Sequence, residues 1–168
     1  SVTDKSEFTI GATTDSNTAS NTVSEGASDN AEVGITATAT DDDDGDSVTY
    51  TMQTTTASCD GWFDIGSSDG IVRVDGSSEL DYETVTACVI SVTSTSTDTS
   101  TSTEDFTITL TDVNEHAVTS PTDTDTDENT LAENVANGAS AEITASASDS
   151  DGTDNTVTYG IASQTLSL

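Results

Sequence analysis

Basic side chains are almost absent from this sequence. Its 168 residues include 2 Lys and Arg residues, Lys5 and Arg73, against 32 Asp and Glu residues, for a formal net charge of −30. Because two cations cannot neutralise a row of phosphate groups, the composition excludes nucleic-acid binding as a function. An anionic membrane surface would repel the chain in the same way, and no segment has the composition of a membrane span.

Signatures of catalysis are also missing. The chain has one histidine, His116, and it contains neither a nucleophile-elbow pattern nor a glycine-rich phosphate loop. An enzyme needs a positioned base and usually a nucleophile or a cofactor. We therefore predict that the protein is not an enzyme.

Aromatic residues make up 4% of the chain, and few aromatics with a high net charge are marks of disorder. However, apolar residues and threonine alternate with period two, as in residues 35–40, and glycine-containing turns follow in step. Helical periodicity is absent. The pattern predicts an ordered all-β protein, with strands around residues 21–24, 31–40, 47–54, 63–65, 71–74, 85–93 and 104–111. The expected core residues are Tyr50, Trp62, Phe63, Ile71, Val89 and Phe106.

The two cysteines, Cys59 and Cys88, show no zinc-like spacing. In a chain of this composition they predict one disulfide and an extracellular location, with a pair of buried free thiols as the alternative.

Comparison of the sequence with itself reveals a repeat. Glu25 and Glu133 lie in similar segments that are 108 residues apart. Ile35 and Ile143 also lie in similar segments at this same interval of 108 residues, which we call the repeat spacing. A second similarity relates residues 106–114 to residues 8–17. We therefore expect three parts: residues 1–17 as the last strand and linker of a preceding repeat, 18–115 as a complete repeat, and 116–168 as the first strands of an incomplete one. A repeat of this size suits a Greek-key, seven-stranded β-sandwich.

Acidic residues lie where strands of such a sandwich would end. Calcium prefers six to eight oxygen ligands, largely carboxylates and carbonyls, in irregular geometry. The sequence offers candidates in four ordered motifs, which are Glu25, Asp81 with Glu83, Asp112 to Glu115, and Asp149 with Asp151. A solvated acidic face is the alternative for any one of these motifs taken alone.

The order of Glu25, an Asp-x-Asp-Gly segment, Leu-Asp-Tyr-Glu at 80–83 and Asp-Val-Asn-Glu at 112–115 resembles the calcium-binding motifs of cadherin repeats. Residues 44–50 resemble repeats of giant bacterial surface adhesins. The resemblance implies calcium (Ca2+) at each junction between repeats. For the downstream junction it implies the ligands Glu25, Asp81, Glu83, Asp112, Asn114, Glu115, Asp149 and Asp151. For the upstream junction it implies Asp15, Asn17, Asp42 and Asp44, with Asp41 and Asp43 as the alternative register of the last pair.

The sequence departs from the family at Glu115, where a shorter Asp is common, and at His116, where the linker lacks the usual proline. The resulting hypothesis is a calcium-stiffened extender or adhesive repeat of an extracellular cell-surface protein. Its expected partners are neighbouring repeats, copies of itself, or a surface protein or glycan. Two alternatives remain: a filament subunit assembled by strand exchange between half-domains, and a carbohydrate- or partner-binding module.

Overall fold

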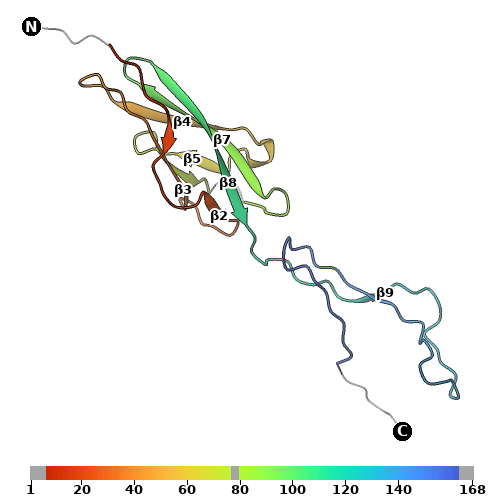
Figure 1. Ribbon diagram of the computed structural model, residues 1–168. Coiled ribbons are helices and arrows are strands. Elements are labelled where there is room, and N and C mark those ends of the chain that lie inside the picture. The colour runs from red at the N-terminus through yellow and green to blue at the C-terminus, as the bar shows by residue number, and fades with distance from the viewer. Residues whose placement is uncertain (1–6, 77–79, 163–168) are drawn as a thin grey trace, which may run out of the picture. The chain divides into compact units, whose positions relative to one another are not determined.

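The computed structural model describes residues 7–76 and 80–162. The chain divides into two compact units, Ser1–Val113 and Asn114–Leu168 (Figure 1). Strands and one short 3-10 turn, η1 (Ala57–Cys59), are the regular elements of the described residues. The all-β prediction is therefore confirmed.

The first unit is a sandwich of two four-stranded sheets, in the orders β1-β3-β6-β5 and β2-β8-β7-β4 (Figure 1). All neighbouring strands are antiparallel except β2 and β8, which are parallel. Because β1 and β2 are two halves of the first strand, divided between the sheets, the architecture is the predicted seven-stranded Greek-key sandwich. Its strands are β1 (Thr14–Asp15), β2 (Thr22–Ser24), β3 (Glu32–Thr38), β4 (Val48–Thr54), β5 (Phe63–Ile65), β6 (Ile71–Val74), β7 (Ala87–Ser96) and β8 (Thr101–Thr111).

The first strand can switch sheets because Gly34 of β3 leaves room for it. Gly34 has a φ of +86°, and a Cβ atom at this position would collide with the backbone carbonyl of Ser20. Ser20 lies in the segment that joins β1 to β2. A glycine is therefore required here both for the backbone conformation and for the close approach of the two segments.

The core lies between the sheets and follows the alternation of the strands. In β7 the side chains of Cys88, Ile90 and Val92 are fully buried, whereas the residues between them are partly exposed. The expected core residues Tyr50, Trp62 and Phe63 are buried, and Phe106 packs against the core from a half-buried position.

Two predicted core positions are wrong. Ile71 and Val89 are only half-buried, while the adjacent Val72 and Ile90 are fully buried. The strands were correctly predicted, but their phase was not, because apolar residues occupy both faces at these points. A shift of one residue exchanges the two faces of a strand.

The predicted disulfide is present. It joins Cys59 of η1 to Cys88 of β7, with a Cα–Cα distance of 6.0 Å, and both residues are fully buried. It therefore ties the connection that follows β4 to a central strand of the same sheet.

The start of the repeat lies earlier than expected. Asp15 belongs to β1, which pairs with β3 of the same sandwich, and Ile10 and Thr13 are buried. The Thr13 hydroxyl donates to the backbone carbonyl of Ser102, in β8, at 2.9 Å. Described residues 7–17 therefore belong to the first unit and not to a preceding repeat. The similarity between residues 8–10 and 106–108 was misleading, because short Phe-Thr-Ile segments fit many strands. Residues 1–6 lie outside the described residues.

The second unit repeats the beginning of the first. Its strands β9 (Thr122–Asp123) and β10 (Ala145–Ser146) pair antiparallel, as β1 pairs with β3, and each paired position is displaced by the repeat spacing. Hydrogen bonds repeat as well: Gly11 N–H donates to Thr40 O at 2.8 Å, and Thr119 N–H donates to Ser148 O at 2.8 Å. The repeat found in the sequence is therefore also a repeat of local structure.

Replacement of both cysteines by alanine should destabilise the first unit by about 3–4 kcal/mol, because the disulfide closes a long loop in the unfolded chain. The cysteines are separated by 29 residues. The measurement is denaturant unfolding followed by Trp62 fluorescence. The unsubstituted chain serves as the reference, once oxidised and once reduced. Equal midpoints for the double variant and the oxidised chain would contradict the prediction.

Candidate metal centre

Glu25 organises one end of the first sandwich. Its Oε1 atom accepts a hydrogen bond from Val113 N–H and its Oε2 atom accepts one from Tyr82 N–H, both at 2.6 Å. One carboxylate therefore fixes the backbone beyond the end of β8 and that of the loop before β7. Hydrogen bonds to a charged acceptor are short and strong, which suits this role.

Three acidic side chains gather at this end. One carboxylate oxygen each from Glu25, Glu83 and Asp112 lies within 4.8 Å of the others. The topology explains two of them. Because β2 runs parallel to β8 with Ser24 opposite Thr111, the residues that follow these strands, Glu25 and Asp112, emerge side by side. The structure thus brings together three residues that the sequence proposed as ligands, and we call Glu25, Glu83 and Asp112 the base cluster.

Asp81 has a different position from the one expected. We predicted that Asp81 and Glu83 face one side of an extended segment, but residues 82–84 form a turn. Asp81 accepts hydrogen bonds from Thr84, from the backbone N–H at 2.8 Å and from the hydroxyl at 2.7 Å. The Val85 N–H also donates to the Asp81 carbonyl. The side-chain caps offered by Asp and Thr therefore overrode the extended conformation.

In the second unit Asp151 is the central acid. It is 2% exposed, and its Oδ1 atom accepts hydrogen bonds from Glu115 N–H at 3.1 Å and His116 N–H at 3.2 Å. Its Oδ2 atom is buried and has no hydrogen-bond partner among the described residues. Asp149 supports it by accepting the Asp151 N–H at 3.3 Å. A buried carboxylate oxygen without a partner is costly unless a cation binds it.

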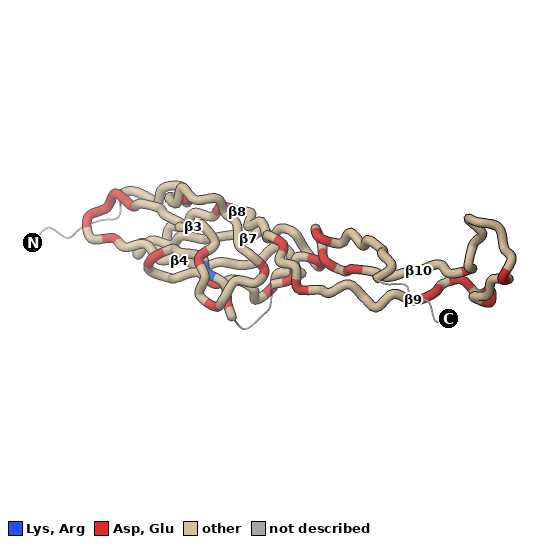
Figure 2. Tube along the Cα trace, turned by 90° about the horizontal axis from the view of Figure 1, so that it is seen from below, with Lys and Arg blue, Asp and Glu red and all other residues tan. Residues whose placement is uncertain are grey.

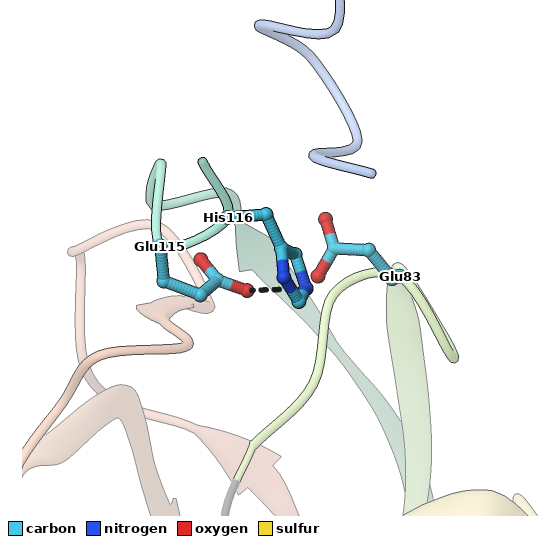
Figure 3. Close-up of side chains that lie close together, drawn as sticks. All are labelled: Glu83, Glu115 and His116. Atoms are coloured by element: carbon cyan, nitrogen blue, oxygen red, sulfur yellow. Dashed lines mark ion pairs between the residues drawn. The ribbon is translucent and has the colours of Figure 1, made fainter. Parts of the chain in front are cut away.

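The other predicted residues of the second unit lie on the surface. Asn114 and Glu115 are exposed. Glu115 forms an ion pair with His116, with 3.7 Å between Oε1 and Nε2 (Figure 3). Both side chains are exposed, so this ion pair contributes little to stability.

A second acidic group lies at the opposite end of the first unit. Oxygens of Asp41, Asp43 and Asp46 lie within 4.8 Å of one another. Asp43 is buried and accepts the backbone N–H groups of Glu7 and Phe8, between 2.9 and 3.1 Å. We call Asp41, Asp43 and Asp46 the tip cluster.

The tip cluster decides the register that the four consecutive aspartates left open. Asp43 N–H donates to Asp41 Oδ1 at 3.3 Å, as Asp151 N–H donates to Asp149 Oδ1. These two pairs are separated by the repeat spacing, whereas Asp42 and Asp44 are exposed. The alternative register is therefore the one that the structure repeats, and Asp42 and Asp44 are not the counterparts of Asp149 and Asp151.

Asp15 and Asn17 are likewise not part of a linker. Asp15 Oδ1 accepts the Thr36 N–H at 3.0 Å and the Asn17 N–H at 2.9 Å, so it fixes β1 against β3. Asp123 does the same for Thr144 and Asp125 in the second unit. The hydrogen bonds from Thr144, Asp125 and the Asn129 amide lower the pKa of Asp123. The repeat spacing instead aligns the linker motif of 112–115 with residues 4–7, of which Glu7 is described.

Arg73 is the one Lys or Arg residue that the structure describes, and it lies in β6 and not in either acidic cluster. It pairs with Asp69 at 2.9 Å and with Glu32 at 3.9 Å. The hydrogen bond from Arg73 holds the pKa of Asp69 below its ordinary value.

Figure 2 shows that acidic residues cluster repeatedly along the trace, with little positive charge near them. An oxygen-rich, all-carboxylate donor set suits Ca2+ better than a transition metal.

Two features escaped the sequence reasoning. Asp46 joins the tip cluster because the loop after Asp43 turns back, with Asp46 N–H donating to Asp43 O at 3.4 Å. In the second unit, oxygens of Asp125, Asp127 and Glu142 lie within 4.8 Å of one another. The alternating Asp-Thr run at 122–127 was a visible signal for part of this group.

Solved structures show the same fold. Drosophila N-cadherin domains EC1-4 are 24% identical with a TM-score of 0.59, over 79% of this chain and 32% of that one. PcdhgB3 EC1-4 is 20% identical with a TM-score of 0.71, over 89% and 35% of the two chains. Mouse cadherin-23 EC22-24 is 21% identical with a TM-score of 0.64, over 89% and 46%. The protein therefore has a cadherin-like β-sandwich fold, and it spans about a third to a half of these structures.

No family model matches the sequence, and no curated protein matches it. At these identities the structural likeness establishes the fold and not the activity. Within the described residues, no helix has the length and apolarity that crossing a membrane would require.

The role of Glu25 as a structural acceptor is testable without metal. In the presence of chelator, Glu25→Ala should lower the free energy of unfolding by about 2 kcal/mol, because two backbone N–H groups lose a charged partner. The matched control is Glu104→Ala, which removes an exposed carboxylate from β8. Chemical denaturation measures both. Equal effects of the two substitutions would show that the Glu25 hydrogen bonds contribute nothing.

Proposed function

We propose that this chain is a calcium-binding, non-enzymatic segment of tandem cadherin-like repeats, and that it works as an extender or adhesive part of an extracellular cell-surface protein. The base cluster is the observation that carries the proposal. Three carboxylates converge there, while the described basic side chain Arg73 is bound to other acids. Converging like charges are unfavourable unless a cation shares them.

Each unit supplies part of a binding site in this proposal. Glu25, Glu83 and Asp112 are the ligands offered by the first unit, with Asp81 as a further ligand after rearrangement of its turn. The second unit offers Asn114, Glu115, Asp149 and Asp151, of which Asp151 carries the buried Oδ2 atom described above. The order of these motifs along the chain, which is that of cadherin repeats, supports the assignment of both groups to shared calcium ions.

The tip cluster is proposed as the corresponding upstream site. Asp41, Asp43 and Asp46 offer three carboxylates, and Glu7 precedes Glu115 by the repeat spacing. Because Asp43 binds the Glu7 and Phe8 N–H groups as Asp151 binds those of Glu115 and His116, the corresponding acidic loops of the two units share the same hydrogen-bond arrangement. Asp15, Asn17, Asp42 and Asp44 are not retained as ligands.

Calcium would act here through charge. Bound Ca2+ neutralises carboxylates that otherwise repel one another, so it stabilises the ordered arrangement of the residues that bind it. Removal of the metal would restore the repulsion and loosen the segment between repeats before it unfolds the sandwich core. Extracellular modules typically bind calcium with a Kd of about 10⁻⁴–10⁻³ M, which suffices where calcium is millimolar.

The proposed partners follow from the same picture. Neighbouring repeats or further copies of the chain are the first candidates, and a surface protein or glycan is the second. One solved structure with a similar fold, that of protocadherin gammaB7 EC3-6, is a cis-dimer. The resemblance of residues 44–50 to bacterial adhesin repeats supports a place in a large bacterial surface protein. The carbohydrate-binding module keeps little support, because Tyr50 and Trp62 are buried in the core.

Calcium titration by calorimetry tests the proposal. The variant Glu83→Gln/Asp112→Asn should lose a class of binding sites, or raise its Kd by at least about tenfold, because two anionic ligands become neutral. The control Glu104→Gln/Asp105→Asn removes the same charge from exposed positions of β8 and should bind as the unsubstituted chain does. At a calcium concentration ten times the Kd, binding should also stabilise the chain by about 1.4 kcal/mol.

Two outcomes would contradict the calcium proposal. One is the absence of saturable calcium binding by the unsubstituted chain. The other is an equal loss in the ligand variant and in the control, which would mean that calcium merely screens a diffuse negative surface. Magnesium provides a further comparison, because it demands a tighter octahedral geometry that converging side-chain carboxylates rarely satisfy.

Strand exchange between copies is a second candidate function, supported by the exposure of the second unit. Positions that form the core in the first unit are open there: Val23 is 6% and Ile35 0% exposed, whereas Leu131 is 51% and Ile143 59% exposed. In the first unit Val23 and Ile35 pack in one core with residues of β7 and β8. In the second unit, strands like β7 and β8 donated by another copy would cover Leu131 and Ile143.

The strand-exchange function predicts self-association that depends on the open face. Ile143→Asp should prevent it, because a carboxylate on this face cannot be buried without a partner. Ile161→Asp, at an exposed position outside β9 and β10, serves as a comparison. Sedimentation of the chain over a range of concentrations measures the effect. Association that is unchanged by Ile143→Asp would remove this candidate.

A further inference from the structure

The outer face of the sheet β2-β8-β7-β4 is built mostly from threonine. Side chains at alternate positions of these strands point away from the core, as the burial pattern of β7 and β8 shows. Ten of the outward positions carry threonine: Thr22, Thr49, Thr51, Thr93, Thr95, Thr101, Thr103, Thr107, Thr109 and Thr111. We call this surface the threonine face.

Strand register arranges six of these threonines in a grid. Thr95 lies between Thr49 and Thr101, and Thr93 lies between Thr51 and Thr103 in the next row. Three strands thus present two aligned rows, with strands about 4.8 Å apart and rows about 6.8 Å apart. An aligned grid of one small residue type gives a regular surface onto which a second sheet can fit.

Several hydroxyl groups of this face are bound within the sheet. Thr93 and Thr103 share a hydrogen bond at 2.9 Å, and the Thr49 hydroxyl donates to Thr95 O at 3.3 Å. Next to the grid, the Thr55 hydroxyl donates to Val89 O at 3.0 Å. The hydroxyls of Thr49, Thr93 and Thr103 are therefore partly satisfied within the sheet, so this part of the face is less polar than its composition suggests.

The threonine face is also nearly free of charge. β4 and β7 contain no charged residue, and Asp105 is the acid at an outward position of β8. The outer face of the opposite sheet carries Glu32, Asp64 and Arg73. In a chain with a net charge of −30, the two sheet faces of the first unit thus differ sharply in charge.

We propose that the threonine face is a docking surface for a second copy of this chain, packed face to face about a twofold axis. Copies that each carry −30 repel one another, so a close contact requires a surface without like charges on both sides. A twofold contact places the same neutral face on both sides, and small side chains allow two sheets to approach to about 10 Å. A basic partner, by contrast, would bind the acidic ends of the unit and not this face. The grid of six threonines contains no residue of the proposed calcium sites, so the interface requires no metal ligand.

Sedimentation equilibrium of the full chain at high salt, where charge repulsion is screened, tests the proposal. The unsubstituted chain should dimerise, and Thr51→Glu/Thr103→Glu should weaken dimerisation by about a hundredfold, because carboxylates would then be buried in the interface without a partner, a cost that salt does not remove. Thr14→Glu/Thr38→Glu adds the same charge to the opposite sheet and should leave dimerisation unchanged. Circular dichroism establishes that each variant is folded. Gln53→Glu, a milder change on the threonine face, should weaken association in the same direction and replaces the double variant if that fails to fold.

Three results would contradict the proposed threonine-face dimer. A monomer at all concentrations and salt levels would exclude it, and so would equal weakening by the substitutions on both sheets. Loss of dimerisation in Ile143→Asp, with none in Thr51→Glu/Thr103→Glu, would assign association to strand exchange instead. The Glu83→Gln/Asp112→Asn variant should dimerise normally, so failure of this proposal and failure of the calcium proposal give different results.

Discussion

Repulsion among carboxylates is the constraint on which the structure of this protein depends. With 32 acids and 2 basic residues, the chain cannot pair its charges internally, so acids must lie where water or metal ions can reach them. The core strands β4 and β7 therefore carry no charge, and the acids collect beyond strand ends. The parallel pairing of β2 with β8 concentrates this effect, because it delivers Glu25 and Asp112 to the same place.

The same constraint explains why acids that form hydrogen bonds bind backbone N–H groups. Glu25, Asp43 and Asp151 each accept two or more such bonds from segments that enter or leave a sandwich. Backbone N–H groups thus take the place of the basic side chains that the sequence lacks. Each of these carboxylates joins loops to strands and has further lone pairs, so under the proposed calcium binding the order of the loops would depend on the metal.

The sequence predicted the strands well because apolar residues and threonine alternate with turn signals between them. It predicted Cys59–Cys88, the repeat length, and the meeting of Glu25, Glu83 and Asp112. It failed where the deciding interaction is local and polar. Asp15 resembled a linker acid, but its hydrogen bonds to Thr36 and Asn17 place it at a strand edge. Among four consecutive aspartates, the backbone bonds of Asp43 identify the register, and the repeat spacing, applied strictly, points to the same pair.

The same hydrogen bonds recur in both units at the repeat spacing. The pairs Gly11–Thr40 and Thr119–Ser148, and Asp43–Asp41 and Asp151–Asp149, keep their geometry although neighbouring residues differ. What is preserved is therefore the backbone network around each acid. Because the pairing of β1 with β3 recurs as that of β9 with β10 at the same spacing, one set of backbone hydrogen bonds builds the acidic loops of both units.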